Sequence, residues 1–276
     1  MLIQWLPLAL VARVGRLGGG LAFYLDGRHR RVALKNLTMC FCREKSAAEI
    51  TSIARENFRR IGENYACAVK TSGMEFNELK PHLEFVGFEK LPRTQDGAKS
   101  PNIVAAIGHF GNFELYARIQ EIRPDLQGAT TYRALKPAGV DRLLQSLRGV
   151  NRCQFFERRR EAAGLRDLMH RGGVIVGLLV DQHSLGLRGP FLGNDCHTNL
   201  APAVLAVRYD CALYSIICRR VGLAKWRLEV GDRIETRTNG SPRSSEDIMR
   251  DVNLALEAAV RRDPANWFWV HRRWKN

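Results

Sequence analysis

The stretch GHFGNFE, residues 108–114, places an imidazole and a carboxylate close together in the chain. His109 precedes Glu114 by five positions, and on a continuous helix two such residues would point about 140° apart. Gly111 interrupts the helix, and Asn112 can cap a new helix behind it. His109 would then lie in a loop, facing Glu114 in the first helical turn. A carboxylate that accepts from one ring nitrogen makes the other a better base, which suits proton removal from an alcohol during acyl transfer.

The same spacing also fits a purely structural role, with a capping His109 and a surface Glu114. Chemistry-bearing residues at other predicted strand ends favour catalysis, because ligands of parallel sheets bind beyond the carboxyl ends of the strands. An imidazole, a guanidinium and a carboxylate would converge there. These residues are His109 after the predicted strand 103–107, Arg133 after 129–132, and Asp181, Gln182 and His183 after 174–180.

The elements that position these residues alternate along the chain, which predicts an α/β fold. We expect a mainly parallel, mixed central sheet flanked by helices, with an N-terminal helical segment. The helix at 46–73 has a capping box, Ser46 to Glu49, at its start. The remaining predicted elements are helices 112–122, 137–147, 157–170, 200–209 and 244–262, strand 212–218, and a hairpin of strands 225–230 and 233–236.

The charge balance indicates a polyanionic partner. The chain has 276 residues, 43 Lys and Arg against 28 Asp and Glu, and a formal net charge of +15. Nucleic acid, an anionic membrane and phosphorylated substrates all fit such a surplus. A nucleic-acid binder is the weaker alternative, because the sequence lacks the signatures of the common nucleic-acid-binding folds. The basic clusters are 28–31, 158–160, 219–220, 261–262 and 271–273.

The cysteines indicate a reducing compartment and do not suggest a metal site. Seven Cys, an odd number, occur without a CxxC pair. A metal hydrolase that uses Asp181, His183, Cys196 and His197 remains an alternative, but no spacing signature supports it. We expect no metal and no cofactor.

Residues 1–25 form an apolar N-terminal segment, which we expect to contact a membrane, and residues 26–276 would form the catalytic domain. A helix over the apolar residues 2–14 would be about 20 Å long, against roughly 30 Å for the hydrocarbon core. Extending it to Leu25 would bury Arg13 and Arg16 at about 2.5–3.5 kcal/mol each. We therefore expect the segment to lie in the interface with both arginines on lipid phosphates. An ordinary buried first helix is the alternative.

Several blocks of the sequence resemble those of the bacterial late lipid A biosynthesis acyltransferases, within the lysophospholipid acyltransferase superfamily. GHFGNFE resembles the H-x4-D/E motif, with Phe113 in a position where Trp is usual. Five further blocks, in the family's order, make the resemblance specific. The other similar blocks are VALKNLTMCF (32–41), TYRALK (131–136), GGVIVGLLVDQ (172–182), GPFLG (189–193) and NWFWVHRRWK (266–275).

The resemblance implies an acyltransferase-like fold and a role for each matched residue. His109 would be the general base and Glu114 would orient it, while Arg133 would bind a phosphate. Asp181 and Gln182 would shape the floor of the site. Gly111, Asn112 and Lys136 would also contact substrate. The segment 194–200 departs from the family because it contains a single Thr, so acyl-chain or acceptor selection can differ there.

The resemblance also implies partners and a location. The donor would be an acyl thioester on acyl carrier protein, or acyl-CoA, and the acceptor a lipid A precursor. Another bacterial glycolipid or phospholipid is the alternative acceptor. The enzyme would act on the cytoplasmic face of the bacterial inner membrane, either peripherally on an anionic surface or anchored by its N-terminus, and would not bind nucleic acid.

Overall fold

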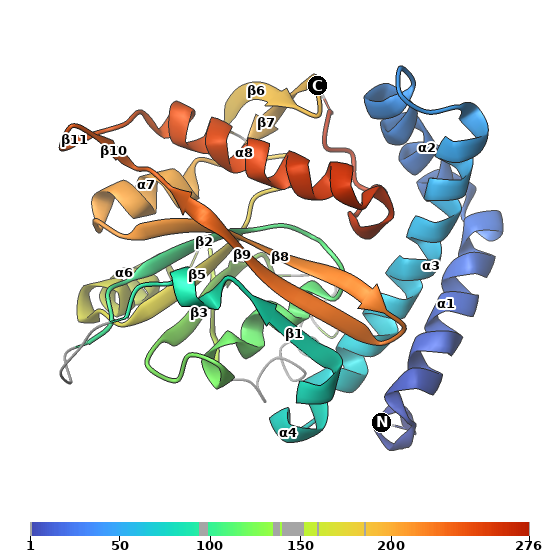
Figure 1. Ribbon diagram of the computed structural model, residues 1–276, viewed down its shortest axis with the longest axis horizontal. Helices are drawn as coiled ribbons and strands as arrows, with labels where there is room; N and C mark the ends of the chain where they lie inside the picture. Colours follow the sequence, from blue (N-terminus) through green and yellow to red (C-terminus); the bar gives the residue numbers. More distant parts are fainter. Residues whose placement is uncertain are drawn as a thin grey trace.

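A seven-stranded sheet lies at the centre of the computed structural model, in the order β1-β9-β8-β2-β5-β3-β4 (Figure 1). Neighbouring strands are parallel, except that β8 and β9 are antiparallel, so the predicted mixed α/β fold is confirmed. The structure describes residues 2–275 apart from 94–98, 135–138, 140–151, 159 and 185. The strands are β1 (Leu83–Val86), β2 (Ile103–Ile107), β3 (Gln127–Tyr132), β4 (Gln154–Glu157), β5 (Val174–Leu179), β8 (Ala212–Gly222) and β9 (Lys225–Ile234).

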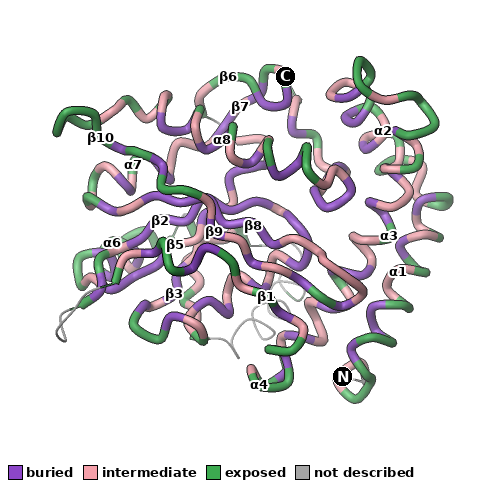
Figure 2. Tube along the Cα trace, viewed as in Figure 1, coloured by how far each residue is buried: buried purple, intermediate pink, exposed green. Residues whose placement is uncertain are grey.

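Helices cover both faces of this sheet, because its central strands are apolar on both sides. Val104 and Ala106 of β2 pack in one core with α6, α7 and α8, whereas Ile103, Ala105 and Ile107 pack in a second core with η4 and α4. Figure 2 shows the central strands as buried. The helices are α4 (Phe76–Leu79), η2 (Lys80–His82), η3 (Phe88–Lys90), η4 (Phe113–Glu121), α6 (Ala162–Arg171), α7 (Ala201–Arg208), α8 (Ser245–Arg262) and η5 (Pro264–Asn266).

Three helices at the N-terminus pack beside this core, after a short turn η1 (Leu2–Trp5). They are α1 (Leu8–Leu25), α2 (Gly27–Phe41) and α3 (Ala47–Ser72), and α1 lies outermost in Figure 1. The predicted capping box at Ser46 and Glu49 begins α3. Glycines allow α1 and α3 to approach closely, since a Cβ atom on Gly62 would lie 2.2 Å from the carbonyl oxygen of Gly15.

Several predicted elements differ from those observed. The helix at 112–122 is the 3₁₀ helix η4, and the one at 157–170 begins only at Ala162, because the unpredicted strand β4 occupies Gln154–Glu157. The predicted hairpin at 225–236 is wrong: β9 is continuous through Gly231, and its antiparallel partner is β8. The structure also has small two-stranded pairs, β6 (Leu187–Phe191) with β7 (Asn194–Thr198) and β10 (Arg237–Thr238) with β11 (Ser241–Pro242). The predicted helix 137–147 lies outside the described residues except for position 139.

Candidate active site

The register of the sheet brings the ends of β2 and β5 to the same level. Ile107 pairs with Leu179 on one side and with Ile216 of β8 on the other. The chain after β2 therefore runs beside the chain after β5, and the N–H of Val180 donates to the carbonyl of Ile107 at 3.1 Å. His109 and Asp181 follow directly, so the expected convergence of strand ends holds for these two residues.

Gly111 lets the chain turn away from the sheet directly after His109. Its φ is +52°, a left-handed conformation that favours glycine. A Cβ atom here would lie 2.6 Å from the carbonyl oxygen of Cys218, so a side chain would also collide with β8. The N–H of Gly111 donates to the carbonyl of Asn266 at 3.1 Å. This turn leaves the imidazole of His109 in the pocket beside the C-terminal residues.

Both ring nitrogens of His109 have polar partners. Nδ1 lies 2.7 Å from Oδ1 of Asp181, and Nε2 lies 3.2 Å from the side-chain amide nitrogen of Gln182. An ionised Asp181 accepts only, so Nδ1 carries the proton and Nε2 accepts from Gln182. The nitrogen that faces Gln182 is therefore the basic one. Asp181, and not Glu114, is the carboxylate that meets Nδ1 of His109.

Asp181 is held in its ionised form although only 1 % of its surface is exposed. Burial alone would raise its pKa, but the neighbouring charge of His109 and the donated hydrogen bonds outweigh burial and lower the pKa to about 2. One bond comes from the backbone N–H of His109 to Oδ2 at 2.7 Å. Another comes from Nε1 of Trp267 to the same oxygen, also at 2.7 Å. The carboxylate thus has a fixed orientation toward His109.

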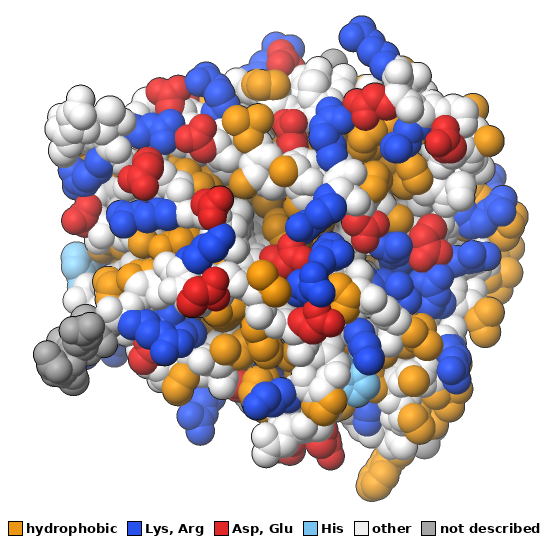
Figure 3. Space-filling view, viewed as in Figure 1, with side chains coloured by type: hydrophobic (Ala, Val, Ile, Leu, Met, Phe, Trp, Pro, Cys, Tyr) orange, Lys and Arg blue, Asp and Glu red, His pale blue; other side chains and the backbone are white. Residues whose placement is uncertain are grey.

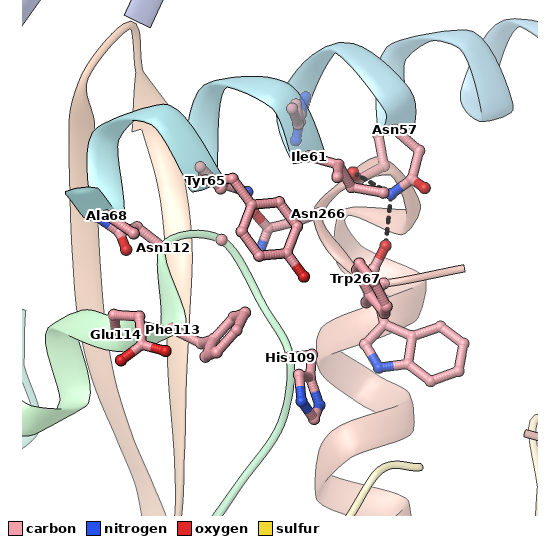
Figure 4. A pocket seen from close by; sticks show the side chains of 15 residues that line it. Asn57, Ile61, Tyr65, Ala68, His109, Asn112, Phe113, Glu114, Asn266 and Trp267 are labelled. Carbon is pink, nitrogen blue, oxygen red and sulfur yellow. Dashed lines mark hydrogen bonds between the residues drawn. The ribbon is translucent and has the colours of Figure 1, made fainter. Parts of the chain in front are cut away.

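Aromatic rings surround the exposed edge of the imidazole (Figure 4). The rings of Phe113 and Phe268 lie 4.9 and 5.9 Å from the His109 ring, and Tyr65 of α3 contacts both phenylalanines. Ile61 of α3 adds an aliphatic side chain to the same pocket. One side of the pocket next to His109 is therefore apolar, which suits a substrate that carries a hydrocarbon chain.

Glu114 lines the same pocket as His109, but Figure 4 shows the ring of Phe113 between the two side chains. The 3₁₀ helix begins at Phe113, and this residue, rather than Glu114, packs against the imidazole. Asn112 does not cap the helix with its side chain, so that prediction is wrong. It is buried, and its amide nitrogen lies 3.3 Å from Oγ1 of Thr71 on α3.

The remaining predicted substrate-binding residues are less close to His109. Arg133 is exposed directly after β3, a strand separated from β2 by β5, and it does not line the pocket around His109. Lys136 lies outside the described residues. Gly111 and Asn112 line the pocket, and Gln182 contacts the imidazole. The structure therefore joins His109, Gly111, Asn112, Glu114, Asp181 and Gln182.

Sequence reasoning missed the part played by Trp267 and Arg273. Arg273 is fully buried, and its guanidinium donates to the carbonyls of Val180 and Gln182 at 3.1 and 2.7 Å. Burial lowers the pKa of Arg273. The block NWFWVHRRWK could have signalled this role, because it has three tryptophans and two adjacent arginines. Large aromatic side chains are usually packed against other residues rather than left exposed.

The residues of the alternative metal site are only partly assembled. The rings of His183 and His197 lie 5.7 Å apart, whereas Asp181 is engaged by His109 and Trp267. Within the described ranges, no group of three or more His, Cys, Asp and Glu side chains has an arrangement that could hold a metal ion.

Comparisons with known proteins find similar sequences over nearly the whole chain. A family model described as bacterial lipid A biosynthesis acyltransferase matches residues 1–276. The chain is similar to the lipid A biosynthesis palmitoleoyltransferase of Escherichia coli (strain K12) and to the lipid A biosynthesis acyltransferase of Shigella flexneri. Each is 24% identical over 282 residues, which cover 98% of this chain and 86% of the relative. The similarity thus includes every element that reaches His109.

Proposed function

Since the chain belongs to the family of bacterial lipid A biosynthesis acyltransferases, we propose that it moves a fatty acyl group from a thioester to a hydroxyl of a lipid A precursor, with His109 as general base. The observation that carries this proposal is the pair of hydrogen bonds to His109. Asp181 holds Nδ1 at 2.7 Å, which leaves Nε2 as the basic atom, and His109 lines a pocket that has aromatic rings on one side.

The proposed reaction begins when the acceptor hydroxyl replaces Gln182 at Nε2 of His109. Nε2 takes the hydroxyl proton while the oxygen attacks the thioester carbonyl, forming a tetrahedral oxyanion. The carbon–sulfur bond then breaks, and the leaving thiolate takes the proton from the imidazolium. Asp181 stabilises the imidazolium without accepting its proton, because its pKa is about 2. The displaced amide of Gln182 is then available to donate to the oxyanion.

Other residues are assigned to the substrates. We propose that Glu114, on the pocket wall, contacts the acceptor rather than the imidazole. Arg133 is proposed to bind a phosphate on the acceptor or the donor, because its planar guanidinium pairs well with phosphate oxygens. The rings of Phe113 and Phe268 would pack against the acyl chain near the reacting carbonyl.

The donor is proposed to be acyl carrier protein, and acyl-CoA is the alternative. A net charge of +15 favours an acidic carrier, and both donors are anionic. The name of the Escherichia coli relative specifies a palmitoleoyl group, which we use only as support for a fatty acyl donor. A glycolipid or phospholipid other than a lipid A precursor remains the second candidate acceptor.

We also propose that α1 lies in the membrane interface on the cytoplasmic face of the inner membrane. By length and composition α1 could cross a membrane. One side of it packs on α3, and the other exposes Val14, Leu17, Leu21 and Leu25 to 57–75 %. Figure 3 shows apolar side chains along this edge next to Lys and Arg. If α1 spanned the membrane, it would draw the charged helix α3 into the hydrocarbon core, whereas an α1 that lies flat in the interface would not.

The two arginines of α1 differ in this arrangement. We expected Arg16 to bind lipid phosphates, but it pairs instead with Glu56 and Glu63 of α3 at 2.9 and 3.2 Å. Arg13 is exposed. Arg13, with Arg28 and Arg31 on α2, is therefore the cationic group that we propose for anionic lipid.

The test of the catalytic proposal is His109→Ala, with His170→Ala on the exposed side of α6 as the matched control. Loss of a general base typically costs about 10²- to 10⁴-fold. Transfer of a labelled acyl group from acyl carrier protein to a lipid A precursor should therefore fall at least about a hundredfold in His109→Ala, while this variant still unfolds cooperatively and the control's activity is unchanged. Normal turnover in His109→Ala would refute the mechanism.

A further inference from the structure

The C-terminal segment, residues 264–274, lies against the two loops that carry the proposed catalytic residues. Figure 1 shows it leaving the end of α8 and passing α3 and α2. Phe110 forms an isolated antiparallel bridge with Trp267, directly after His109. Arg273 donates to the carbonyls on both sides of Asp181, at Val180 and Gln182. One segment far away in sequence therefore touches both strand-end loops.

Three tryptophans of this segment donate indole hydrogen bonds to different acceptors. Trp269 donates to the carbonyl of Pro264 at 2.6 Å, within the segment itself. Trp274 donates to the carbonyls of Phe191 and Asn194. Trp267 alone among these donates to a carboxylate, Oδ2 of Asp181, at 2.7 Å. The three rings pack on one another, so their apolar surroundings are similar and their acceptors differ.

The bond from Trp267 is one of the contacts that fix the orientation of the Asp181 carboxylate. Oδ2 accepts from Trp267 and from the N–H of His109, and Oδ1 is the oxygen that meets Nδ1 of His109. A carboxylate that loses one of the two donors to Oδ2 can rotate, and Oδ1 then leaves the plane of the imidazole. Arg273 fixes only the neighbouring main chain, so it cannot prevent this rotation.

We propose that Trp267 is a positioning residue, which acts through Asp181 to hold His109 as the Nδ1–H tautomer with Nε2 toward the substrate. The proposal rests on His109 being the general base. A positioning role for Trp267 also explains why several hydrogen bonds from α2 and α3 hold the C-terminal segment in place. Asn57 of α3 donates to the carbonyls of Ala265 and Trp267, and Asn36 of α2 donates to those of Trp269 and His271.

The experiment removes the indole N–H and keeps the ring. Benzothienylalanine, in which sulfur replaces the indole N–H, is introduced at Trp267 in the full chain, with the same replacement at Trp269 as the matched control. Trp267→Phe and Trp269→Phe serve as encodable versions. A small misplacement of a catalytic group can cost up to about a hundredfold. We expect kcat to fall about ten- to a hundredfold for both changes at Trp267, with KM changed less than about twofold. Both changes at Trp269 should leave kcat near wild type.

The outcomes separate this inference from the proposed function. If the variant with benzothienylalanine at Trp267 keeps full kcat while the separate variant His109→Ala is inactive, the positioning role of Trp267 is overturned and the general-base proposal is not. Equal loss of kcat at Trp267 and Trp269 overturns it as well, because general packing would then explain the effect. Nitrogen-15 spectra of the histidines give an independent readout. The Nδ1–H tautomer of His109 should be lost on replacement of Trp267 and kept on replacement of Trp269.

Discussion

The contact between α1 and α3 allows a quantitative prediction, because two glycines of the N-terminal region differ only in their surroundings. A Cβ atom on Gly62 of α3 would lie 2.2 Å from the carbonyl oxygen of Gly15 and 2.8 Å from Cα of Gly19. A Cβ atom on Gly18 of α1 would meet nothing within 4 Å. Both positions are inside helices, where Ala is favoured over Gly by about 0.8–1.0 kcal/mol.

Gly18→Ala should therefore stabilise the protein by up to about 1 kcal/mol. Gly62→Ala gains the same propensity, but its methyl group meets backbone atoms that cannot rotate away. Overpacking typically costs about 1–3 kcal/mol, and backbone contacts belong at the upper end. Separating the helices would also strain the nearby pair of Arg16 and Glu63, at 3.2 Å. The net change for Gly62→Ala is a destabilisation of about 2 kcal/mol.

Thermal unfolding of the full chain in mild detergent, followed by circular dichroism, measures both changes. One kcal/mol moves Tm by about 2–4 °C in a protein of comparable size. Gly62→Ala should therefore lower Tm by about 4–8 °C, and Gly18→Ala should raise it by about 2 °C. If Gly62→Ala unfolds at or above the Tm of Gly18→Ala, the close helix contact is refuted, and α1 is free to leave α3.

Two further predictions concern acid stability and membrane binding. The lowered pKa of Asp181, about 2, means that its charge stabilises the fold above about pH 4 and that this contribution is lost as the pH falls through 2. The unfolding free energy of the wild type should thus fall more steeply between pH 4 and 2 than that of Asp181→Asn; parallel curves would contradict the buried ionised carboxylate. Replacing Leu17 and Leu21 by Ser should weaken sedimentation with anionic vesicles at high salt, while Leu254→Ser on the exposed side of α8 should not. Equal binding by all variants would place the membrane contact elsewhere.

The sheet was predictable from sequence where strands are buried on both sides. The strand at 103–107 is a continuous apolar run and matches β2 in both bounds. β4 was missed because Gln154–Glu157 is partly exposed at the edge of the sheet and has polar residues at both ends. Gly231 was interpreted as a turn residue, but it lies within β9. Close packing explains why a glycine is present there, since a Cβ atom would lie 2.5 Å from Oγ of Ser215.

The partners of charged residues were less predictable than the elements, because they depend on contacts that are distant in sequence. Asp181 was expected near His109, yet its role as the hydrogen-bond partner depends on the register of β2 and β5. The basic clusters were expected to face a polyanion. Several of their members instead pair with carboxylates of this chain, including Arg219 with Glu229 and Arg261 with Glu44. Such pairing leaves fewer arginines for a partner than the basic clusters suggest.

The segment 1–25 was expected to be separate from the catalytic domain, but the contacts of Glu63 argue for a closer connection. Glu63 of α3 is fully buried, and its carboxylate accepts from Arg16 of α1, from Arg220 of β8 and from the N–H of Ala224. Removing α1 would expose this carboxylate and take away one of its two cationic partners. Because α3 also carries Asn57, which holds the C-terminal segment, the loss would extend toward Trp267. We therefore propose that residue 25 separates two functions but not two folding units.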